Sequence, residues 1–193
     1  DSCFSLITLD LSGFNTSNVQ DMSGMFNNCY ELASLDVSNF DTSKVETMCS
    51  MFGNCDHLDR LDLSSFDTSN VTNMNDMFHD CYRLTTLDLS NFDTSKVTEM
   101  GGMFYECERL TELDLSNFDT SNVTDMRDMF YGCSNLTTIK GIIDMKSCTE
   151  ENYYFMFYKC PNLKDVKIKN PPADTDLWKK AGFRSESQFT VVS

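Results

Sequence analysis

The stretch LTELDLSNFDTSNVTDMRDMFYGCSN, from Leu110 to Asn135, decides how this chain folds. The 26 residues before it, Leu84 to Arg109, read LTTLDLSNFDTSKVTEMGGMFYECER and are identical to it at 18 of the 26 positions. Composition alone does not produce two adjacent copies this similar. A period of roughly 20–50 residues is typical of proteins built from stacked repeats. The sequence therefore predicts an elongated array of similar units.

The same unit extends over most of the 193 residues. Five full 26-residue repeats begin at Leu6, Leu32, Leu58, Leu84 and Leu110, and a degenerate sixth begins at Leu136. After Lys169, the sequence Asn-Pro-Pro breaks the pattern and begins a different composition. We therefore predict a repeat domain over residues 1–169, followed by a C-terminal cap or the start of a linker over residues 170–193.

Within each repeat, two periodicities predict a strand and a helix. Apolar and polar residues alternate in Leu87–Leu89, which is typical of a short strand with its leucines inward. Later in the repeat, apolar residues recur at helical spacing, at Val97, Met100, Met103 and Phe104. A helix of about ten residues is too short to be stable alone, so we expect it to pack against its own strand and its neighbours.

The C-terminal residues fit a cap. Residues 174–180 can form a short helix that carries Leu177 and Trp178, and residues 189–192 can form a terminal strand. A stacked array exposes an apolar cross-section at its end and needs such a cover.

These residues carry a family resemblance. The pattern Leu-x-x-Leu-x-Leu at this period resembles a leucine-rich repeat. The ending Met-Phe-x-x-Cys-x-x-Leu, preceded by Asp-Thr-Ser-x-Val-Thr-x-Met, resembles the BspA-like branch, which is common in bacterial surface proteins. The resemblance covers about residues 3–163.

The resemblance implies an α/β fold, a right-handed leucine-rich-repeat solenoid shaped like a horseshoe. Short parallel strands would line its concave face, short helices would line its convex face, and the C-terminal cap would close it. It also implies adhesion or protein recognition within a larger exported protein, located outside the cell or on the bacterial cell surface. No catalytic residues come with the resemblance.

Composition narrows the classes of function. With 15 Lys and Arg against 30 Asp and Glu, the net charge of −15 argues against binding to nucleic acid or anionic lipid. No apolar run approaches the roughly 18 residues that a membrane-spanning helix needs. We find no acid–base pair, no nucleophile with a nearby His and no phosphate loop, so we expect neither an enzyme nor a cofactor. Because Asp1 falls inside a repeat, we expect a fragment of a longer protein. We also expect this fragment to be monomeric.

The recurring cysteines have two interpretations. They occupy one column of the repeat, at Cys3, Cys29, Cys55, Cys81, Cys107, Cys133 and Cys160. Coils stack about 4.8 Å apart, which lies within the roughly 4.4–6.8 Å that a disulfide spans between Cα atoms. Side chains in one column point parallel, however, so we favour buried free thiols. With only two His residues and no C-x-x-C motif, we predict no metal site here.

A column of aspartates lies between the strand leucines, at Asp10, Asp36, Asp62, Asp88 and Asp114. Like charges on neighbouring strands repel, so something must compensate them. Serines two residues further along could donate hydrogen bonds, Lys140 and Lys167 could neutralise one end of the column, and calcium could bridge the carboxylates. We favour a structural hydrogen bond in each coil and keep partner binding and calcium as alternatives.

Residues that differ between the copies are the better candidates for recognition, because a rigid scaffold presents them on its surface. Together with the aspartates they predict a binding site on the concave face, formed by Arg60, Asp62, Thr86, Asp88, Glu112 and Asp114. We hypothesise a non-enzymatic adhesion module that binds a host or other extracellular protein there. The alternatives are a structural spacer or stalk and a calcium- or carbohydrate-binding module.

Overall fold

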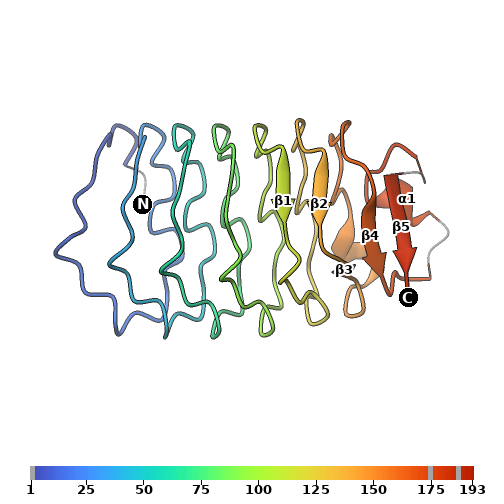
Figure 1. The fold of residues 1–193 in the computed structure, drawn as a ribbon, viewed down its shortest axis with the longest axis horizontal. Helices are drawn as coiled ribbons and strands as arrows, with labels where there is room; N and C mark the ends of the chain where they lie inside the picture. Colours follow the sequence, from blue (N-terminus) through green and yellow to red (C-terminus); the bar gives the residue numbers. More distant parts are fainter. Residues whose placement is uncertain (1–2, 174–175, 186–187) are drawn as a thin grey trace.

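The computed structural model describes residues 3–173, 176–185 and 188–193. The chain winds into stacked coils that follow one another along a straight line in the view of Figure 1. We number the coils by the cysteine column, so that coils 1 to 5 cover residues 3–28, 29–54, 55–80, 81–106 and 107–132, and coil 6 covers residues 133–159. The C-terminus lies beside the last coil (Figure 1).

Regular secondary structure is sparse and concentrates in the C-terminal half. Strands β1 (Glu112–Asp114) and β2 (Thr138–Lys140) form a parallel pair. Strands β3 (Ile143–Asp144), β4 (Val166–Lys169) and β5 (Phe189–Val192) form a second parallel sheet in that order. A 3-10 helix, η1, covers Glu150–Tyr153, and one α-helix, α1, covers Leu177–Lys180. In the earlier coils, single parallel bridges join residues Asp21, Thr47, Asn73, Glu99 and Asp125.

The predicted helix over each Met-Phe segment is wrong. The amide of Met100 donates to the carbonyl of Asp125 in the next coil at 2.9 Å, and the amide of Gly102 donates to that of Arg127 at 2.8 Å. Between these bonds, the amide of Met103 donates to the carbonyl of Met100, three residues back. An α-helix would instead join residues four apart within one segment. The segment is therefore a run of tight turns bonded to the next coil.

Backbone dihedrals explain why the turns do not continue as a helix. In coil 4, Gly102 and Glu106 have φ values of +61° and +51°, each at the third position of a four-residue turn. A positive φ at this position is the mark of a type II turn and interrupts a right-handed helix. Other coils repeat it at Gly24, Asn28, Ser50, Asn54, Asp76, Asp80, Asp128, Gly132, Phe155 and Lys159.

The fold class predicted above is corrected accordingly. The described residues of coils 1 to 5 contain no helix, and the coils do not trace a horseshoe in Figure 1. Two consecutive turns of the form Met-x-x-Met-Phe-x-x-Cys bury residues at i, i+3, i+4 and i+7, which is also the spacing of a helical stripe. The apolar period therefore indicated the buried side chains correctly and the backbone conformation wrongly.

Stacked aromatic rings form the centre of the core. One phenylalanine per coil stacks on the next, with ring centroids between 5.4 and 5.8 Å apart, from Phe26 through Phe52, Phe78, Phe104 and Phe130 to Phe157. Phe183 and Phe189 extend the stack into the C-terminal residues at 4.5 and 5.0 Å. Burial of such large side chains dominates the stabilisation of the array.

Buried polar groups bridge neighbouring coils. The Thr68 hydroxyl donates to the carbonyl of Asp93 at 2.9 Å and accepts the amide of the same residue at 2.8 Å. The Cys81 thiol donates to the carbonyl of Phe52 at 3.2 Å, and the other cysteines from Cys55 to Cys160 in the column make the same contact. All nine cysteines are free, and in the column Cys29 to Cys160 are buried while Cys3 is exposed. The prediction of buried free thiols is therefore confirmed for the column from Cys29 onward.

The C-terminal residues cover the last coil. β5 pairs in parallel with β4, from Val166–Phe189 to Lys169–Val192, and confirms the predicted terminal strand. α1 falls within the predicted short helix, although Asp174, where that prediction begins, lies outside the described residues.

Candidate functional site

The aspartate column and its serines form one surface, which we call the Asp–Ser face. It consists of Asp10, Asp36, Asp62, Asp88 and Asp114 with Ser12, Ser38, Ser64, Ser90 and Ser116. In each coil the serine amide donates to Oδ1 of the aspartate two residues earlier, at 2.9 to 3.1 Å. The structural hydrogen bond predicted for this column is therefore confirmed.

These hydrogen bonds keep the aspartates charged. The amide of Ser90, and after it the Ser90 hydroxyl, lower the pKa of Asp88. The pKa of Asp62 is lowered in the same way by Ser64, and that of Asp114 by the Ser116 hydroxyl and then its amide. The side chains are exposed, and the serine amide occupies only Oδ1. A row of ionised carboxylates therefore faces solvent, one per coil.

Lys140 ends this row on the C-terminal side. Its ammonium group forms an ion pair with Glu112 and lies 3.9 Å from Oδ2 of Asp114. The compensation of the column by Lys140, which the sequence predicts, is therefore present. Because Lys140 and Glu112 are both about half exposed, the pair contributes little to stability. Its main effect is to place a positive charge at the C-terminal end of the row of negative aspartates.

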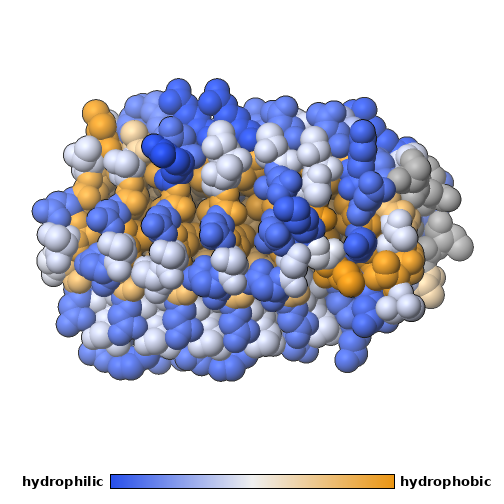
Figure 2. All heavy atoms as spheres, viewed as in Figure 1, coloured by the Kyte–Doolittle hydropathy of each residue, from blue (hydrophilic) through white to orange (hydrophobic). Residues whose placement is uncertain are grey.

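Two pockets lie between coils on the Asp–Ser face. Arg60, Asp62, Thr86 and Asp88 line the first, of about 330 Å³, together with Leu61, Leu63, Ser64, Ser90 and Asn91. Asp88 and Asp114 line the second, of about 290 Å³, together with Leu87, Leu89, Ser90, Ser116 and Asn117. Figure 2 shows an apolar band that crosses this face between rows of hydrophilic residues. Apolar leucines and charged neighbours therefore contribute to the same pockets.

Of the six binding residues predicted from the sequence, the structure brings five to these pockets. Glu112 lines neither pocket, and its carboxylate forms an ion pair with Lys140 of the next coil. Arg60 is exposed and forms no ion pair or hydrogen bond with any described residue. A guanidinium group in this state is available to a partner molecule.

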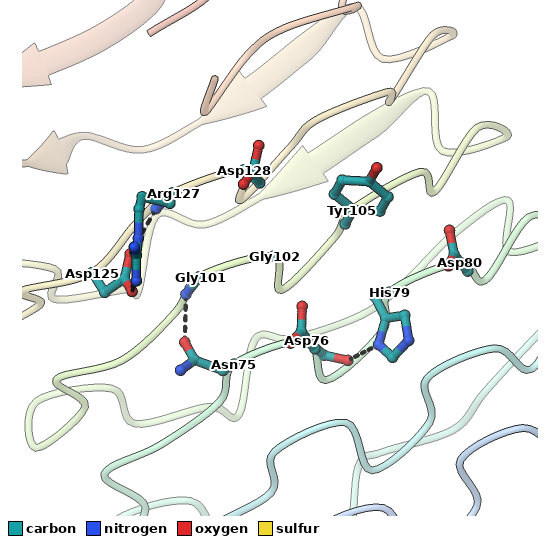
Figure 3. A pocket seen from close by; sticks show the side chains of 10 residues that line it. All are labelled: Asn75, Asp76, His79, Asp80, Gly101, Gly102, Tyr105, Asp125, Arg127 and Asp128. Carbon is teal, nitrogen blue, oxygen red and sulfur yellow. Dashed lines mark hydrogen bonds and ion pairs between the residues drawn. The ribbon is translucent and has the colours of Figure 1, made fainter. Parts of the chain in front are cut away.

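A third pocket, of about 410 Å³, opens on the turns of coils 3, 4 and 5 and was not predicted. Figure 3 shows Asp125 and Arg127 together at one end of it, and His79, Asp80 and Tyr105 towards the other. Arg127 contacts both carboxylate oxygens of Asp125, which is itself buried. Gly101 and Gly102 form part of the lining, where coils 3 and 5 have Asn75–Asp76 and Arg127–Asp128.

Two carboxyl groups in this third pocket, those of Asp76 and Asp128, have raised pKa values. Burial raises the pKa of Asp76, the charges of Asp80 and Asp125 raise it further, and His79 opposes them. Burial also raises the pKa of Asp128, although Arg127 lowers it. The sequence signal for this pocket was the Gly101–Gly102 pair, since no other coil lacks both side chains.

Among residues 3–173, 176–185 and 188–193, no group of three or more His, Cys, Asp or Glu side chains is placed to hold a metal ion. The same residues include no helix with the length and apolarity that crossing a bilayer requires.

Comparison with known proteins identifies the family. Residues 2–87 and residues 62–170 each match a family described as "Mycoplasma protein of unknown function, DUF285". Neither a curated protein nor a solved structure matches the chain. The two matches overlap and together extend from residue 2 to residue 170, over most of the coils. The chain therefore belongs to the family of Mycoplasma proteins of unknown function called DUF285.

Proposed function

We propose that this protein is a non-enzymatic recognition module that binds a protein partner across the Asp–Ser face. The observation that carries the proposal is the pair of pockets in which leucines lie beside ionised aspartates and the unpaired Arg60. Protein interfaces combine an apolar centre with a polar, solvent-exposed rim. Because the carboxylates outnumber the cations over coils 1 to 4, the favoured partner presents basic side chains.

We further propose an extracellular or cell-surface location and a role in adhesion. The support is the resemblance of the repeat sequence to the BspA-like leucine-rich repeats. The exposed charges of the Asp–Ser face would attract a basic partner at long range, and this attraction would weaken as salt is added.

The proposal is tested with defined extracellular proteins and with an extended arginine-rich peptide as a charged probe. Binding is measured by titration calorimetry at low and at physiological salt. We expect Asp62→Asn combined with Asp88→Asn to weaken binding of the peptide by about tenfold or more, since two carboxylates on one face are removed. Arg60→Glu is expected to change which proteins bind, because it reverses the one unpaired cation in the first pocket.

Arg109→Glu is the matched control. Arg109 is exposed on the turn between Cys107 and Leu110, outside both pockets. The exchange alters the net charge as Arg60→Glu does but leaves the pockets intact. Equal effects of the two arginine variants would contradict binding at the Asp–Ser face.

A structural spacer is the second candidate function. The regular use of each aspartate in a hydrogen bond to its own coil favours it, because such a column needs no partner. A spacer would bind none of the tested proteins and would respond to the arginine-rich peptide only in proportion to net charge. In that case all three variants would follow net charge alone.

A further inference from the structure

The Asp–Ser face continues beyond coil 5, and its continuation carries the opposite charge. The repeat position of Asp88 and Asp114 is taken by Lys140 in coil 6 and by Lys167 in β4. We propose that the partner of this face is a protein segment with segregated charges, basic over the aspartates and acidic over the lysines of β4. This inference rests on the proposed function and specifies the partner of the same face.

Backbone pairing carries the face from coil 5 through coil 6 to β4. Asp114 lies opposite Lys140 in the parallel register of β1 and β2. The amide of Lys164 donates to the carbonyl of Thr137 in coil 6 at 3.2 Å. Both residues lie three positions before the lysine of their own segment, so Lys167 follows Lys140 in the row. Figure 1 shows β1, β2 and β4 side by side in this order.

Charged side chains at the outward positions divide the face into two parts. These positions are that of the aspartate and those two residues before and after it. In coils 1 to 5 they hold the five aspartates and Glu112, and Arg60 is the one basic residue. In coil 6 and β4, Asp165 is the one acidic residue, and the basic residues are Lys140, Lys167 and Lys169. The face is therefore acidic over coils 1 to 5 and basic at its C-terminal end.

The lysines of β4 are open to a partner. Val166 and Ile168 of this strand are fully buried, whereas Lys167 is exposed and Lys169 is half-buried. Alternate residues of a strand point to the same side, so the two lysines share the side away from the core. Neither ammonium group forms an ion pair with any described residue. Their charges are therefore available to carboxylates of another molecule.

An exposed apolar side chain lies where the charge reverses. Ile142 takes the place of the serine of the earlier coils and is 44% exposed, whereas Ile143 enters the core. Gly141 allows this path, because its φ is +102° and an added Cβ would lie 2.6 Å from the carbonyl oxygen of Leu115. Figure 2 shows apolar side chains at the surface near this end of the face. A partner can therefore place an apolar residue between its basic and acidic parts.

Charge complementarity selects the partner. A uniformly basic segment that covered the whole face would be repelled by Lys167 and Lys169, and a uniformly acidic one would be repelled by the aspartates. A segment with separate basic and acidic parts is attracted at both ends. Such a segment needs no net charge, so its binding does not depend on the overall charge of −15.

The experiment compares two peptides that contain equal numbers of Arg and Glu around a central pair of leucines. In the segregated peptide, all arginines precede the leucines and all glutamates follow them. In the mixed peptide, arginine and glutamate alternate. Binding of each peptide to the full chain is measured by titration calorimetry at physiological salt. We expect the segregated peptide to bind about tenfold more tightly or better, since both peptides have zero net charge and only one matches the face.

Variants of the lysines locate the effect. Lys167→Glu combined with Lys169→Glu removes the basic end and should reduce the preference for the segregated peptide to less than about twofold. Lys44→Glu combined with Lys96→Glu is the matched control. It makes the same change in net charge at exposed residues in coils 2 and 4 that line neither pocket of the face, and it should leave the preference intact.

The outcomes separate this inference from the proposed function. Equal affinities for the two peptides, with binding of the arginine-rich peptide still weakened by Asp62→Asn and Asp88→Asn, would overturn the segregated partner alone. A preference that survives the exchange of Lys167 and Lys169 would also overturn it. Binding of the arginine-rich peptide that ignores both aspartate exchanges would contradict the proposed function and this inference together.

Discussion

A single threonine per coil holds two coils together by satisfying two backbone groups at once. The Thr68 side chain is 1% exposed and bonds to both the carbonyl and the amide of Asp93. Valine has the same shape but no hydroxyl, so Thr68→Val would leave both groups without that partner. We expect a loss of about 1–3 kcal/mol in the free energy of unfolding, measured by urea denaturation.

Thr86→Val is the control for this prediction. Thr86 is exposed, and its hydroxyl makes no hydrogen bond with the described residues. Its replacement should change stability by less than about 0.5 kcal/mol. Equal costs at the two positions would show that the threonine column does not bridge the coils.

The charge state of Asp76 predicts an unusual pH dependence. The pKa of Asp76 is raised, so its ionised form destabilises the folded protein, and this cost appears as the pH rises through the raised pKa. Below the ordinary value of 3.8 the carboxyl group is protonated in both states and the cost is absent. We therefore expect Asp76→Asn to raise the unfolding midpoint at pH 7 and to have little effect below about pH 4.

Asp88→Asn should lower the unfolding midpoint at pH 7, whereas Asp76→Asn should raise it. The pKa of Asp88 is lowered, so its ionised form contributes stability that is present above pH 3.8 and is lost as the pH falls through the lowered pKa. Thermal unfolding of Asp76→Asn and Asp88→Asn, measured between pH 2 and pH 7, tests both predictions. Parallel pH profiles for the two variants would contradict the assignment.

At the scale of the element, the path of the Met-Phe segment is the feature that sequence periodicity could not resolve. Helices and paired turns bury the same positions, so the apolar columns predict the core in either case. The distinguishing signal lay in the polar positions, where Asn28, Asp80 and Gly102 tolerate a positive φ. The strand at Phe189–Val192 was predictable because its residues, Phe-Thr-Val-Val, are all aromatic or β-branched, which favours a strand.

Gly102→Ala separates the two conformations by the sign of its effect. In a helix, alanine would stabilise the segment by about 1 kcal/mol relative to glycine. In the observed turn, φ is +61° and an added Cβ would lie 2.1 Å from Oδ1 of Asp76. We therefore expect a destabilisation of about 1–2 kcal/mol, measured by urea denaturation.

Two companion variants interpret that result. Gly13→Ala places its Cβ in open space and should be close to neutral. Combining Gly102→Ala with Asp76→Ala removes the steric contact and should recover part of the loss, leaving the cost of the backbone conformation. An increase in stability from Gly102→Ala alone would contradict the observed turn and would favour an α-helix in this segment.

The candidate site was partly predictable for a related reason. Side chains at Asp62, Thr86 and Asp88 project from alternating positions whose outward direction is set by the buried leucines beside them. Glu112 was placed on the correct face, but its capture by Lys140 depends on which residue the next, degenerate coil brings opposite. The third pocket depends on contacts among three coils, which one repeat sequence does not encode.

At the scale of the whole molecule, stability depends on the contact of each coil with the next. The Phe78 ring is fully buried between Phe52 and Phe104. Phe78→Ala is expected to lower the free energy of unfolding by about 3–5 kcal/mol. Because each coil is stabilised by its neighbours, we also expect the two ends of the array to unfold in separate transitions. Phe14→Ala, at the half-exposed end of the column that includes Phe40, should cost clearly less. Calorimetry measures the loss of stability in both variants. Equal losses for Phe78→Ala and Phe14→Ala would contradict the stacking of coils as the source of stability.

The alignment of the Asp–Ser face depends on the hydrogen bonds that run from coil to coil. The most direct test of them is the scalar coupling across the hydrogen bond of the Gly102 amide, measured by NMR on isotopically labelled protein. The structure predicts a coupling to the carbonyl carbon of Arg127, 25 residues further along the chain. A coupling to the carbonyl carbon of Thr98, four residues back, would mean an α-helix and would contradict the account.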